Sequence, residues 1–488
     1  MATLSELVKG VQVISVSGDV NRKIEGVAFD SRKAGPGYLF VAVKGTKTDG
    51  HEYIKPAVES GAVAIVCEKL PSGAGPSVIW ITVADSAEAL GMICSNFYGN
   101  PSAHLHLVGV TGTNGKTTIA TLLYRMFSRL GYKCGLFSTV CNYIGEKELP
   151  ATHTTPDPVQ LNRTLAMMAE EGCGYAFMEV SSHAADQKRI AGLSFSGGIF
   201  TNLTHDHLDY HGTFSNYLKA KKSFFDSLAD NAFALVNTDD KNGRVMLQNC
   251  RARKYTYSVR GMADFRAGII EQDFSGMELR IQGEEVWTRF IGDFNASNLL
   301  AVYACSELLG AEKTEILTIL SDLGPVPGRL ESVRSGSGIT GLVDYAHTPD
   351  ALFNVIETIN RIRGKGSRLL TVVGAGGDRD RSKRPGMASI SAGGSSKVIL
   401  TSDNPRTEDP ERILDDMEAG ITPEQRPGVL RIADRREAIR TAVMLAQKGD
   451  IILVAGKGHE TYQEIMGVRH HFDDREELEA ALLLKTWN

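Results

Sequence analysis

The chain lacks several features that would assign it to a common class of protein. Its 488 residues carry a net charge of −5, and this absence of basic excess argues against binding nucleic acid through a broad basic surface. No stretch approaches the roughly 18 uninterrupted apolar residues of a membrane-spanning helix. The N-terminus has no charged-then-apolar signal pattern. We therefore expect a cytoplasmic protein without membrane insertion.

Cysteines are few and scattered. The seven cysteines include no Cys-x-x-Cys pair, which is typical of reduced, mostly buried thiols and not of a disulfide framework. Internal repeats and low-complexity segments are missing as well. The 42% hydrophobic content can bury several cores, and the length suggests about three domains.

Alternating apolar strands and helical stretches divide the chain into three blocks. The alternation predicts an α/β fold with a smaller N-terminal domain (1–98), a central parallel-sheet domain (99–330) and a C-terminal Rossmann-like domain (331–488). A Gly-Asn-Pro-Ser turn at 99–102 marks the first boundary. The Gly- and Pro-rich segment 324–328 is the expected hinge before the third domain.

Individual elements follow from local apolar runs. Strands are expected at 37–43, 63–66, 78–82, 105–110, 175–180, 198–200, 232–236, 369–373, 398–400 and 451–454, and helices at 119–130 and 217–228. The near-continuous apolar runs of the third block are typical of strands buried on both faces.

The segment 109–118 reads Gly-Val-Thr-Gly-Thr-Asn-Gly-Lys-Thr-Thr. An apolar run precedes it and a helical pattern follows, which is the context of a phosphate-binding loop. Lys116 is placed to reach the β- and γ-phosphates, and the Thr117 hydroxyl to bind Mg²⁺. Because Val110 stands where the strict pattern has its first glycine, this is a variant P-loop. It predicts that the central domain (99–330) is a P-loop parallel-sheet ATPase domain.

Polar side chains follow the next two predicted strands of the second block. Glu179 ends one of them and is placed either to coordinate the Mg²⁺ carried by Thr117 or to face solvent. The segment 205–211 holds three His and two Asp. Three interpretations stay open for it: a zinc hydrolase motif in which Tyr210 replaces a required His, a Mg²⁺ site near the phosphates, or loop hydrogen bonding.

Two further clusters follow strands of the third block. The Gly-rich segment 374–381 contains Arg379, and the segment 403–406 reads Asp-Asn-Pro-Arg. Arginine forks match planar carboxylates, and Asp403 suits an ammonium group, so the pair indicates a pocket for a zwitterionic amino acid. A surface ion-pair network is the alternative. The segment 456–460, Gly-Lys-Gly-His-Glu, points to the same sheet edge.

These motifs, in this order, resemble those of the Mur ligase family over essentially the whole chain. The resemblance rests on the segments 111–118, 179–183 (Glu-Val-Ser-Ser-His), 201–207 (Thr-Asn-Leu-Thr-His-Asp-His), 328–331 (Gly-Arg-Leu-Glu) and 344–349 (Asp-Tyr-Ala-His-Thr-Pro). The Asp-Asn-Pro-Arg segment resembles the signature of members that add meso-diaminopimelate instead of lysine.

The resemblance implies an ATP-dependent amide ligase of peptidoglycan precursor synthesis. It would activate UDP-MurNAc-L-Ala-D-Glu as an acyl phosphate and capture it with meso-diaminopimelate, with Mg²⁺ as cofactor, ATP as co-substrate and a monomer as the working form. A lysine-adding ligase, folylpolyglutamate synthase and a slow nucleotide switch are the alternatives. Arg406 argues against the first, the Asp-Ser-Arg segment 30–32 against the second, and the contexts of Asn295 and Asp344 against the third.

The resemblance also implies residue roles. The catalytic residues would be Lys116, Lys221, His207 and Arg329. The metal ligands would be Thr117, Glu179, His207 and Lys221. Lys221 would be carbamylated, because residues 217–221 match the Tyr-x-x-Ala-Lys context of the carbamylated lysine in this family. ATP would contact Gly112, Thr113, Asn114, Gly115, Lys116, Thr117, Thr118, Asn295, Arg329 and Asp344. The UDP-sugar dipeptide would contact Phe29, Ser31, Thr46, Lys47, Thr48, Thr154, Thr155, Ser181, Gln187 and Arg189. The added amino acid would contact Arg379, Asp403, Asn404, Pro405, Arg406, Gly456 and Glu460.

Overall fold

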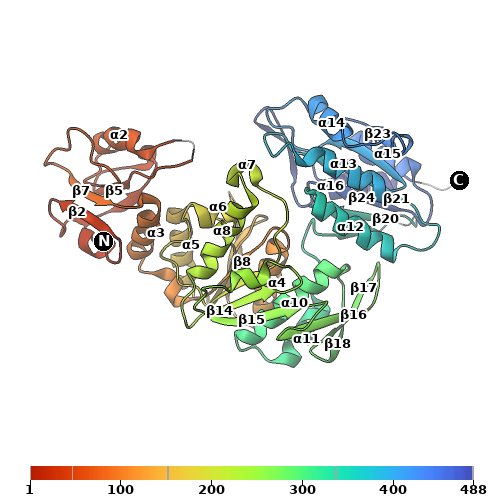
Figure 1. Ribbon diagram of the computed structural model, residues 1–488, viewed down its shortest axis with the longest axis horizontal. Helices are drawn as coiled ribbons and strands as arrows, with labels where there is room; N and C mark the ends of the chain where they lie inside the picture. The colour runs from red at the N-terminus through yellow and green to blue at the C-terminus, as the bar shows by residue number, and fades with distance from the viewer. Residues whose placement is uncertain (1, 47, 151–152, 335, 337, 486–488) are drawn as a thin grey trace.

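Three sheets form three successive parts of the molecule in a computed structural model of the chain (Figure 1). The structure describes residues 2–46, 48–150, 153–334, 336 and 338–485. Each part has helices packed against a mostly parallel sheet, which confirms the predicted three-part α/β architecture. Among the described residues, no helix is long and apolar enough to cross a membrane.

The N-terminal part is a five-stranded sheet in the order β2-β7-β6-β5-β4, parallel apart from β2. Its central strands are apolar throughout because helices or loops cover both faces. The elements are β1 (Ala2–Thr3), α1 (Leu4–Leu7), β2 (Val13–Ser17), β3 (Lys23–Ile24), β4 (Gly26–Ala28), the 3₁₀ helix η1 (Ser31–Lys33), β5 (Tyr38–Val41), the 3₁₀ helix η2 (Gly50–Tyr53), α2 (Ile54–Glu59), β6 (Ala64–Cys67), β7 (Ile79–Val83) and α3 (Ser86–Phe97).

The middle part is built on a sheet of eleven strands in the order β11-β10-β9-β12-β8-β13-β14-β15-β16-β17-β18. Its elements are the 3₁₀ helix η3 (Pro101–His104), β8 (His106–Thr111), α4 (Lys116–Arg129), β9 (Cys134–Phe137), β10 (Asn142–Ile144), β11 (Lys147–Leu149), α5 (Pro158–Glu170), β12 (Tyr175–Glu179), α6 (Ser182–Asp186), β13 (Gly197–Phe200), α7 (Leu208–His211), α8 (Phe214–Asp226), β14 (Phe233–Asn237), α9 (Gly243–Met246), β15 (Arg253–Ser258), β16 (Phe265–Asp273), β17 (Gly276–Ile281), β18 (Glu284–Thr288), α10 (Asp293–Leu308) and α11 (Lys313–Asp322).

Helix α4 shows why the helix after the P-loop forms where it does. Gly115 precedes it with a φ of 89°, a conformation that glycine adopts without steric strain. Apolar side chains then recur at 119, 122, 123, 126 and 127, and all of them are buried in the core. This 3,4-spaced stripe places the helix against the sheet and points its N-terminus at the end of β8.

The C-terminal part is a six-stranded sheet in the order β19-β20-β24-β21-β22-β23, parallel apart from β19. Helices α12, α13 and α14 cover one face, and α15 and α16 cover the other, which is the predicted doubly wound arrangement. The elements are β19 (Glu331–Arg334), β20 (Thr340–Asp344), α12 (Pro349–Ile362), β21 (Leu369–Ala375), α13 (Lys383–Gly394), β22 (Lys397–Ser402), α14 (Pro410–Glu418), the 3₁₀ helix η4 (Arg426–Gly428), β23 (Val429–Arg431), α15 (Arg435–Leu445), β24 (Ile451–Ala455), β25 (Tyr462–Ile465), β26 (Val468–His471) and α16 (Asp474–Leu483).

Candidate functional site

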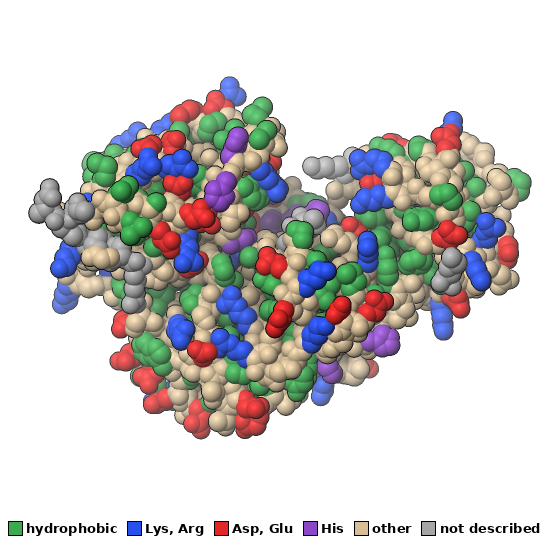
Figure 2. All heavy atoms as spheres, turned by 180° about the vertical axis from the view of Figure 1, so that it is seen from behind, with side chains coloured by type: hydrophobic (Ala, Val, Ile, Leu, Met, Phe, Trp, Pro, Cys, Tyr) green, Lys and Arg blue, Asp and Glu red, His purple; other side chains and the backbone are tan. Residues whose placement is uncertain are grey.

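The phosphate-binding loop lies at the centre of the site because of the strand order. Strand β8 lies between β12 and β13 and runs parallel to both, with Val110 opposite Glu179 and Thr111 opposite Phe200. The polar segments that follow these strands therefore meet at one sheet edge, as predicted. Seen from behind, the molecule has a hollow between its three parts, with histidine side chains at its floor (Figure 2).

The loop itself has the tight backbone that its glycines predict. Gly112 has a φ of 149°, and a Cβ atom there would lie 1.8 Å from the hydroxyl of Thr201, so any larger residue would clash. The Lys116 ammonium donates to the carbonyls of Gly112, at 3.0 Å, and Thr113, at 2.8 Å. Burial lowers the pKa of Lys116.

Lys221 reaches the same loop from helix α8. Its side chain is buried, and its Nζ donates to the carbonyl of Gly112 at 2.7 Å. Burial, followed by the nearby charge of Lys116, lowers the pKa of Lys221 well below its usual value. Glu179 is also buried, and its carboxylate accepts a hydrogen bond from the backbone N–H of Thr139 at 2.6 Å.

The rings of His207 and His211 in the loop at 201–211 both pack on the His183 ring, with centroids 4.9 and 5.6 Å from it, whereas His205 has a different neighbour. His205 faces Asp380 of the C-terminal part, with Nε2 and Oδ2 3.8 Å apart, whereas His211 contacts the Ser182 hydroxyl at 3.0 Å. His207 adopts a left-handed backbone with a φ of 54°, and burial lowers its pKa to about 3. Within the described part of the chain, no three His, Cys, Asp or Glu side chains converge as metal ligands. The geometry does not support the zinc hydrolase interpretation.

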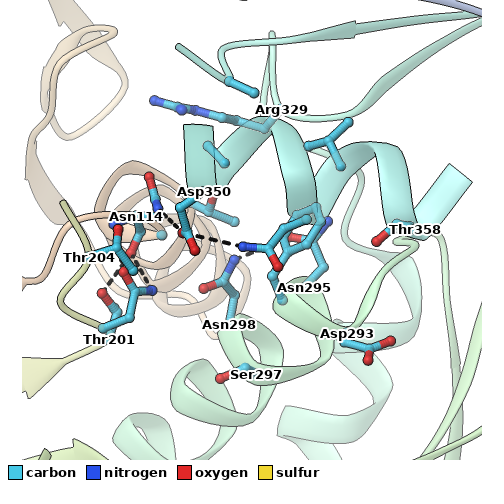
Figure 3. A pocket seen from close by; sticks show the side chains of 18 of the residues that line it. Asn114, Thr201, Thr204, Asp293, Asn295, Ser297, Asn298, Arg329, Asp350 and Thr358 are labelled. Atoms are coloured by element: carbon cyan, nitrogen blue, oxygen red, sulfur yellow. Dashed lines mark hydrogen bonds between the residues drawn. The ribbon is translucent and has the colours of Figure 1, made fainter. Parts of the chain in front are cut away.

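A cavity of about 280 Å³ lies between the P-loop and the C-terminal part (Figure 3). It contains Asn114, Gly115, Thr118, Asn295, Arg329 and Asp344 among its walls, so six of the predicted ATP residues meet there. Asn114 donates to Asp350 on α12 at 3.2 Å, which joins the two parts across the cavity.

Arg329 holds a position between the cavity and the P-loop. Its guanidinium stacks on the Tyr345 ring at 4.5 Å and donates to the Thr117 hydroxyl at 3.1 Å. Its Nε is buried and has no hydrogen-bond partner among the described residues. A buried donor of this kind is suited to donate a hydrogen bond to an anionic oxygen.

Asp344 accepts two hydrogen bonds from the backbone. Its carboxylate accepts the N–H groups of Leu330, at 2.6 Å, and Ala346, at 2.7 Å. Burial raises its pKa to about 6. The side chain borders the cavity, but two of its acceptor positions already accept backbone N–H groups, from Leu330 just before β19 and from Ala346 in the loop before α12.

The predicted dipeptide residues cluster beside Glu179. The Thr155 hydroxyl donates to the Glu179 carbonyl at 2.8 Å and accepts the Ser181 N–H at 3.2 Å. Arg189 donates to the Thr155 carbonyl at 2.9 Å and to Gln187 Oε1 at 2.7 Å. Thr154 joins the group through the Thr139 hydroxyl.

The predicted uridine residues lie in the N-terminal part, which contacts the middle part through α3 and α5. Ser31 begins η1, which Asp30 caps, and Phe29 packs against the N-terminal core. Thr46 and Thr48 are exposed, and Lys47 lies outside the described residues.

The predicted amino-acid residues come together where β21, β22 and β24 end. Arg406 donates to the Gly377 carbonyl at 2.6 Å, and Glu460 accepts the Asn404 amide at 2.6 Å. A Cβ on Gly456 would lie 2.6 Å from Asp403 Oδ2, so these two strand ends are in close contact. Pro405 lies between Asn404 and Arg406, and Arg379 is exposed at the rim.

Sequence reasoning missed several residues of the cavity. They lie on helices α10 and α12 or on the loops after β14 and β15, and they are Asp239, Asp240, Arg260, Asn298, Asp350, Asn354 and Thr358. Asp350 directly follows the 344–349 motif, so its place at the start of a helix was a usable signal. The others depend on tertiary packing.

Three protein-family profiles match the chain. They are described as the Mur ligase family catalytic domain (23–98), the Mur ligase middle domain (110–306) and the Mur ligase glutamate ligase domain (328–458).

Curated relatives match nearly the whole chain. Proteins of Phocaeicola vulgatus and Bacteroides thetaiotaomicron, both named UDP-N-acetylmuramoyl-L-alanyl-D-glutamate–2,6-diaminopimelate ligase, are 58% identical over 97% of this chain and 98% of their own lengths. A solved structure of a ligase with this name is 34% identical and superposes with a TM-score of 0.69, covering 99% of this chain and 98% of its own. Folylpolyglutamate synthase of Mycobacterium tuberculosis shares the fold over 76% of this chain and 92% of its own, with a TM-score of 0.63 and 18% identity.

Proposed function

The chain belongs to the Mur ligase family, and from this premise we propose that it joins 2,6-diaminopimelate to UDP-MurNAc-L-Ala-D-Glu with ATP, in peptidoglycan precursor synthesis. The observation that carries the proposal is the 58% identity to diaminopimelate ligases over 97% of the chain. The Asp-Asn-Pro-Arg segment 403–406, at the end of β22, supports the choice of amino acid.

The chemistry needs two steps, because a carboxylate is a poor electrophile for an amine. The γ-phosphoryl group passes from ATP to the D-Glu carboxylate, which releases ADP and forms an acyl phosphate. The amine of diaminopimelate then attacks the acyl carbon, inorganic phosphate leaves, and an amide remains. Both steps concentrate negative charge, so cationic and N–H donors around that charge accelerate them.

The P-loop side of the cavity is suited to that charge. Lys116 and the amides at the start of α4 would hold the phosphates, and the unpartnered Nε of Arg329 would approach the transferring group. Asn295 and Asp344 would face the nucleoside.

Magnesium fits the oxygen donors beside this loop. Thr117 and Glu179 offer a hydroxyl and a carboxylate, and His207 lies in the neighbouring loop. Lys221 would add carbamate oxygens if modified, and its buried Nζ beside the Gly112 carbonyl supports that assignment. Bound Mg²⁺ would neutralise phosphate charge in this site.

The other substrates would enter from the two outer parts. The muramoyl dipeptide would be bound by Thr154, Thr155, Ser181, Gln187 and Arg189. Its uridine end would be bound by Phe29, Ser31, Thr46 and Thr48. The amino acid would bind at Arg379, Asp403, Asn404, Arg406, Gly456 and Glu460. We propose that the C-terminal part closes about 324–328 and excludes water from the acyl phosphate. We also propose that the protein works as a monomer in the cytoplasm.

Phosphate release from ATP tests the function directly. With UDP-MurNAc-L-Ala-D-Glu and Mg²⁺ present, release should require meso-diaminopimelate and should not occur with L-lysine. Release with lysine would keep the ligase and discard the amino-acid assignment. Release that ignores both amino acids would favour a nucleotide switch.

A further inference from the structure

Lys457 is a completely buried lysine beside the predicted amino-acid pocket. It follows strand β24 within the segment 456–460, and its side chain is 0% exposed. A buried ammonium is stable only where nearby acceptors replace water. Its surroundings therefore indicate what this residue does.

Three acceptors surround the Lys457 Nζ. They are Asn404 Oδ1 at 3.2 Å, Glu460 Oε2 at 3.3 Å and the carbonyl of Tyr462, whose ring also lies 5.5 Å from the ammonium. An ammonium has three hydrogens, so its donor capacity is used in full. Two of these acceptors belong to residues proposed to bind the amino acid.

The hydrogen bonds of Lys457 fix which way Asn404 points. With its Oδ1 turned to Lys457 and to the Glu464 N–H, at 2.9 Å, the Asn404 amide must donate to Glu460, at 2.6 Å. The Glu464 carbonyl in turn accepts the N–H of Arg406 at 3.0 Å. Arg406 has a left-handed φ of 52°, which a β-bridge to Ile465 helps to hold. The network thus extends from Lys457 to the arginine of the pocket.

Lys457 also balances charge at Glu460. Burial and the neighbouring Asp403 raise the pKa of Glu460, while Lys457 lowers it. The titratable and charged groups around Glu460 are Asp403, Lys457, Arg435, Tyr345 and Tyr462. Without the lysine, Glu460 would stay protonated to a higher pH and would hold a substrate ammonium less well.

We propose that Lys457 is a positioning residue for the amino-acid substrate, which orients Asn404 and Arg406 and holds the Glu460 carboxylate in place. This rests on the proposed ligase function. Lys457 does not touch the reacting atoms in this proposal. Its loss should therefore act on the amino acid and leave the other two substrates alone.

The experiment measures KM for meso-diaminopimelate, ATP and UDP-MurNAc-L-Ala-D-Glu in wild type, Lys457→Met and Lys457→Gln between pH 6 and 9. In both neutral variants the KM for diaminopimelate should rise roughly tenfold, with the other two within about twofold. The KM for diaminopimelate should increase at low pH, where Glu460 becomes protonated. In the neutral variants this increase should begin at a higher pH than in wild type. Lys457→Arg, which keeps the positive charge, should restore the wild-type pH profile.

Lys397→Met is the matched control, because Lys397 lies at the opposite end of β22 and donates to the Pro427 carbonyl at 3.0 Å. It should leave all three KM values unchanged. If the wild-type protein does not use diaminopimelate, the proposed function is refuted. That result is distinct from a failure of the Lys457 inference. An unchanged KM and pH profile in the neutral variants would overturn the inference. So would equal changes for all substrates, or neutral variants that fail to fold while Lys457→Arg folds.

Discussion

Two buried lysines, one in each half of the site, have opposite surroundings. Lys457 is enclosed by three acceptors, one of them a carboxylate, and its charge is compensated. Among the described residues, the Lys221 ammonium donates one hydrogen bond, to the Gly112 carbonyl, and lies 4.8 Å from the Tyr217 ring. A second lysine, Lys116, lies nearby and further disfavours its ammonium form. Burial alone therefore does not assign a role to a lysine. The hydrogen-bond acceptors around the ammonium make the difference. The compensated Lys457 is suited to stabilise a pocket, and the uncompensated Lys221 is suited to modification.

The largest effect should come from Lys221. Lys221→Ala removes the proposed carbamate, and we expect phosphate release with all substrates to fall on the order of 10²- to 10³-fold. Short carboxylates added to the assay should restore part of the activity, because they can supply the missing oxygens. Lys457→Met should show no such rescue.

The control for this experiment is Lys219→Ala, an exposed lysine on the same helix. It should retain wild-type activity. Equal losses in Lys219→Ala and Lys221→Ala, or full activity in the latter, would remove the distinction between the two buried lysines.

Asp344 lies between the P-loop and the C-terminal part, and its buried carboxyl should make the free energy of unfolding depend on pH. Because burial raises its pKa from 3.8 to about 6, the folded protein binds a proton between these values that the unfolded chain has lost. The free energy of unfolding should therefore fall as pH rises from about 4 to about 6, by up to about 3 kcal/mol. Denaturant unfolding across this range should show the fall in wild type and not in Asp344→Asn. Parallel pH profiles of the two proteins would contradict the assignment.

Arg406 tests the far end of the Lys457 network. Arg406→Ala should raise the KM for meso-diaminopimelate roughly 10- to 100-fold, because a guanidinium that pairs with a carboxylate is lost. The KM for ATP should stay unchanged. Steady-state kinetics with each substrate varied in turn measure both. An unchanged diaminopimelate KM would refute the proposed role of this arginine.

The strands and the P-loop were predictable from sequence because their signals are local. The expected strand at 175–180 is β12, and the expected helix at 119–130 lies within three residues of α4. The antiparallel extension β16–β18 was not predicted, because its strands are half-exposed and alternate polar with apolar residues.

The candidate site was predictable only in part, for a similar reason. Short motifs with glycines and charged residues mark Lys116, Glu179 and Arg406. The Gly-Lys-Gly-His-Glu segment marks the place of Lys457 but not its role, and Asn298 carries no such mark. The contacts of both residues depend on neighbours brought together from distant segments. The histidine-rich loop shows a different case: its local pattern left a zinc motif, a Mg²⁺ site and loop hydrogen bonding open, and only the fold shows that His205 faces Asp380 while His207 and His211 pack on His183.

The smallest effect should come from Tyr210, which counted against a zinc motif in the sequence. Its hydroxyl accepts the Gln187 amide at 3.1 Å and donates to Asp186 at 2.8 Å, so it positions the proposed dipeptide-binding pair of Gln187 and Arg189. Tyr210 thus has the same positioning role in the middle part that we propose for Lys457 in the C-terminal part, but without a charge.

Tyr210→Phe removes one hydrogen-bonding hydroxyl, and the KM for UDP-MurNAc-L-Ala-D-Glu should rise roughly two- to tenfold. The KM for diaminopimelate should not change, in contrast to Lys457→Met. Tyr132→Phe, at an exposed tyrosine of the same part, is the matched control. A change in the diaminopimelate KM would mean that the two halves are coupled through the loop at 201–211. The two positioning groups would then belong to one network instead of two.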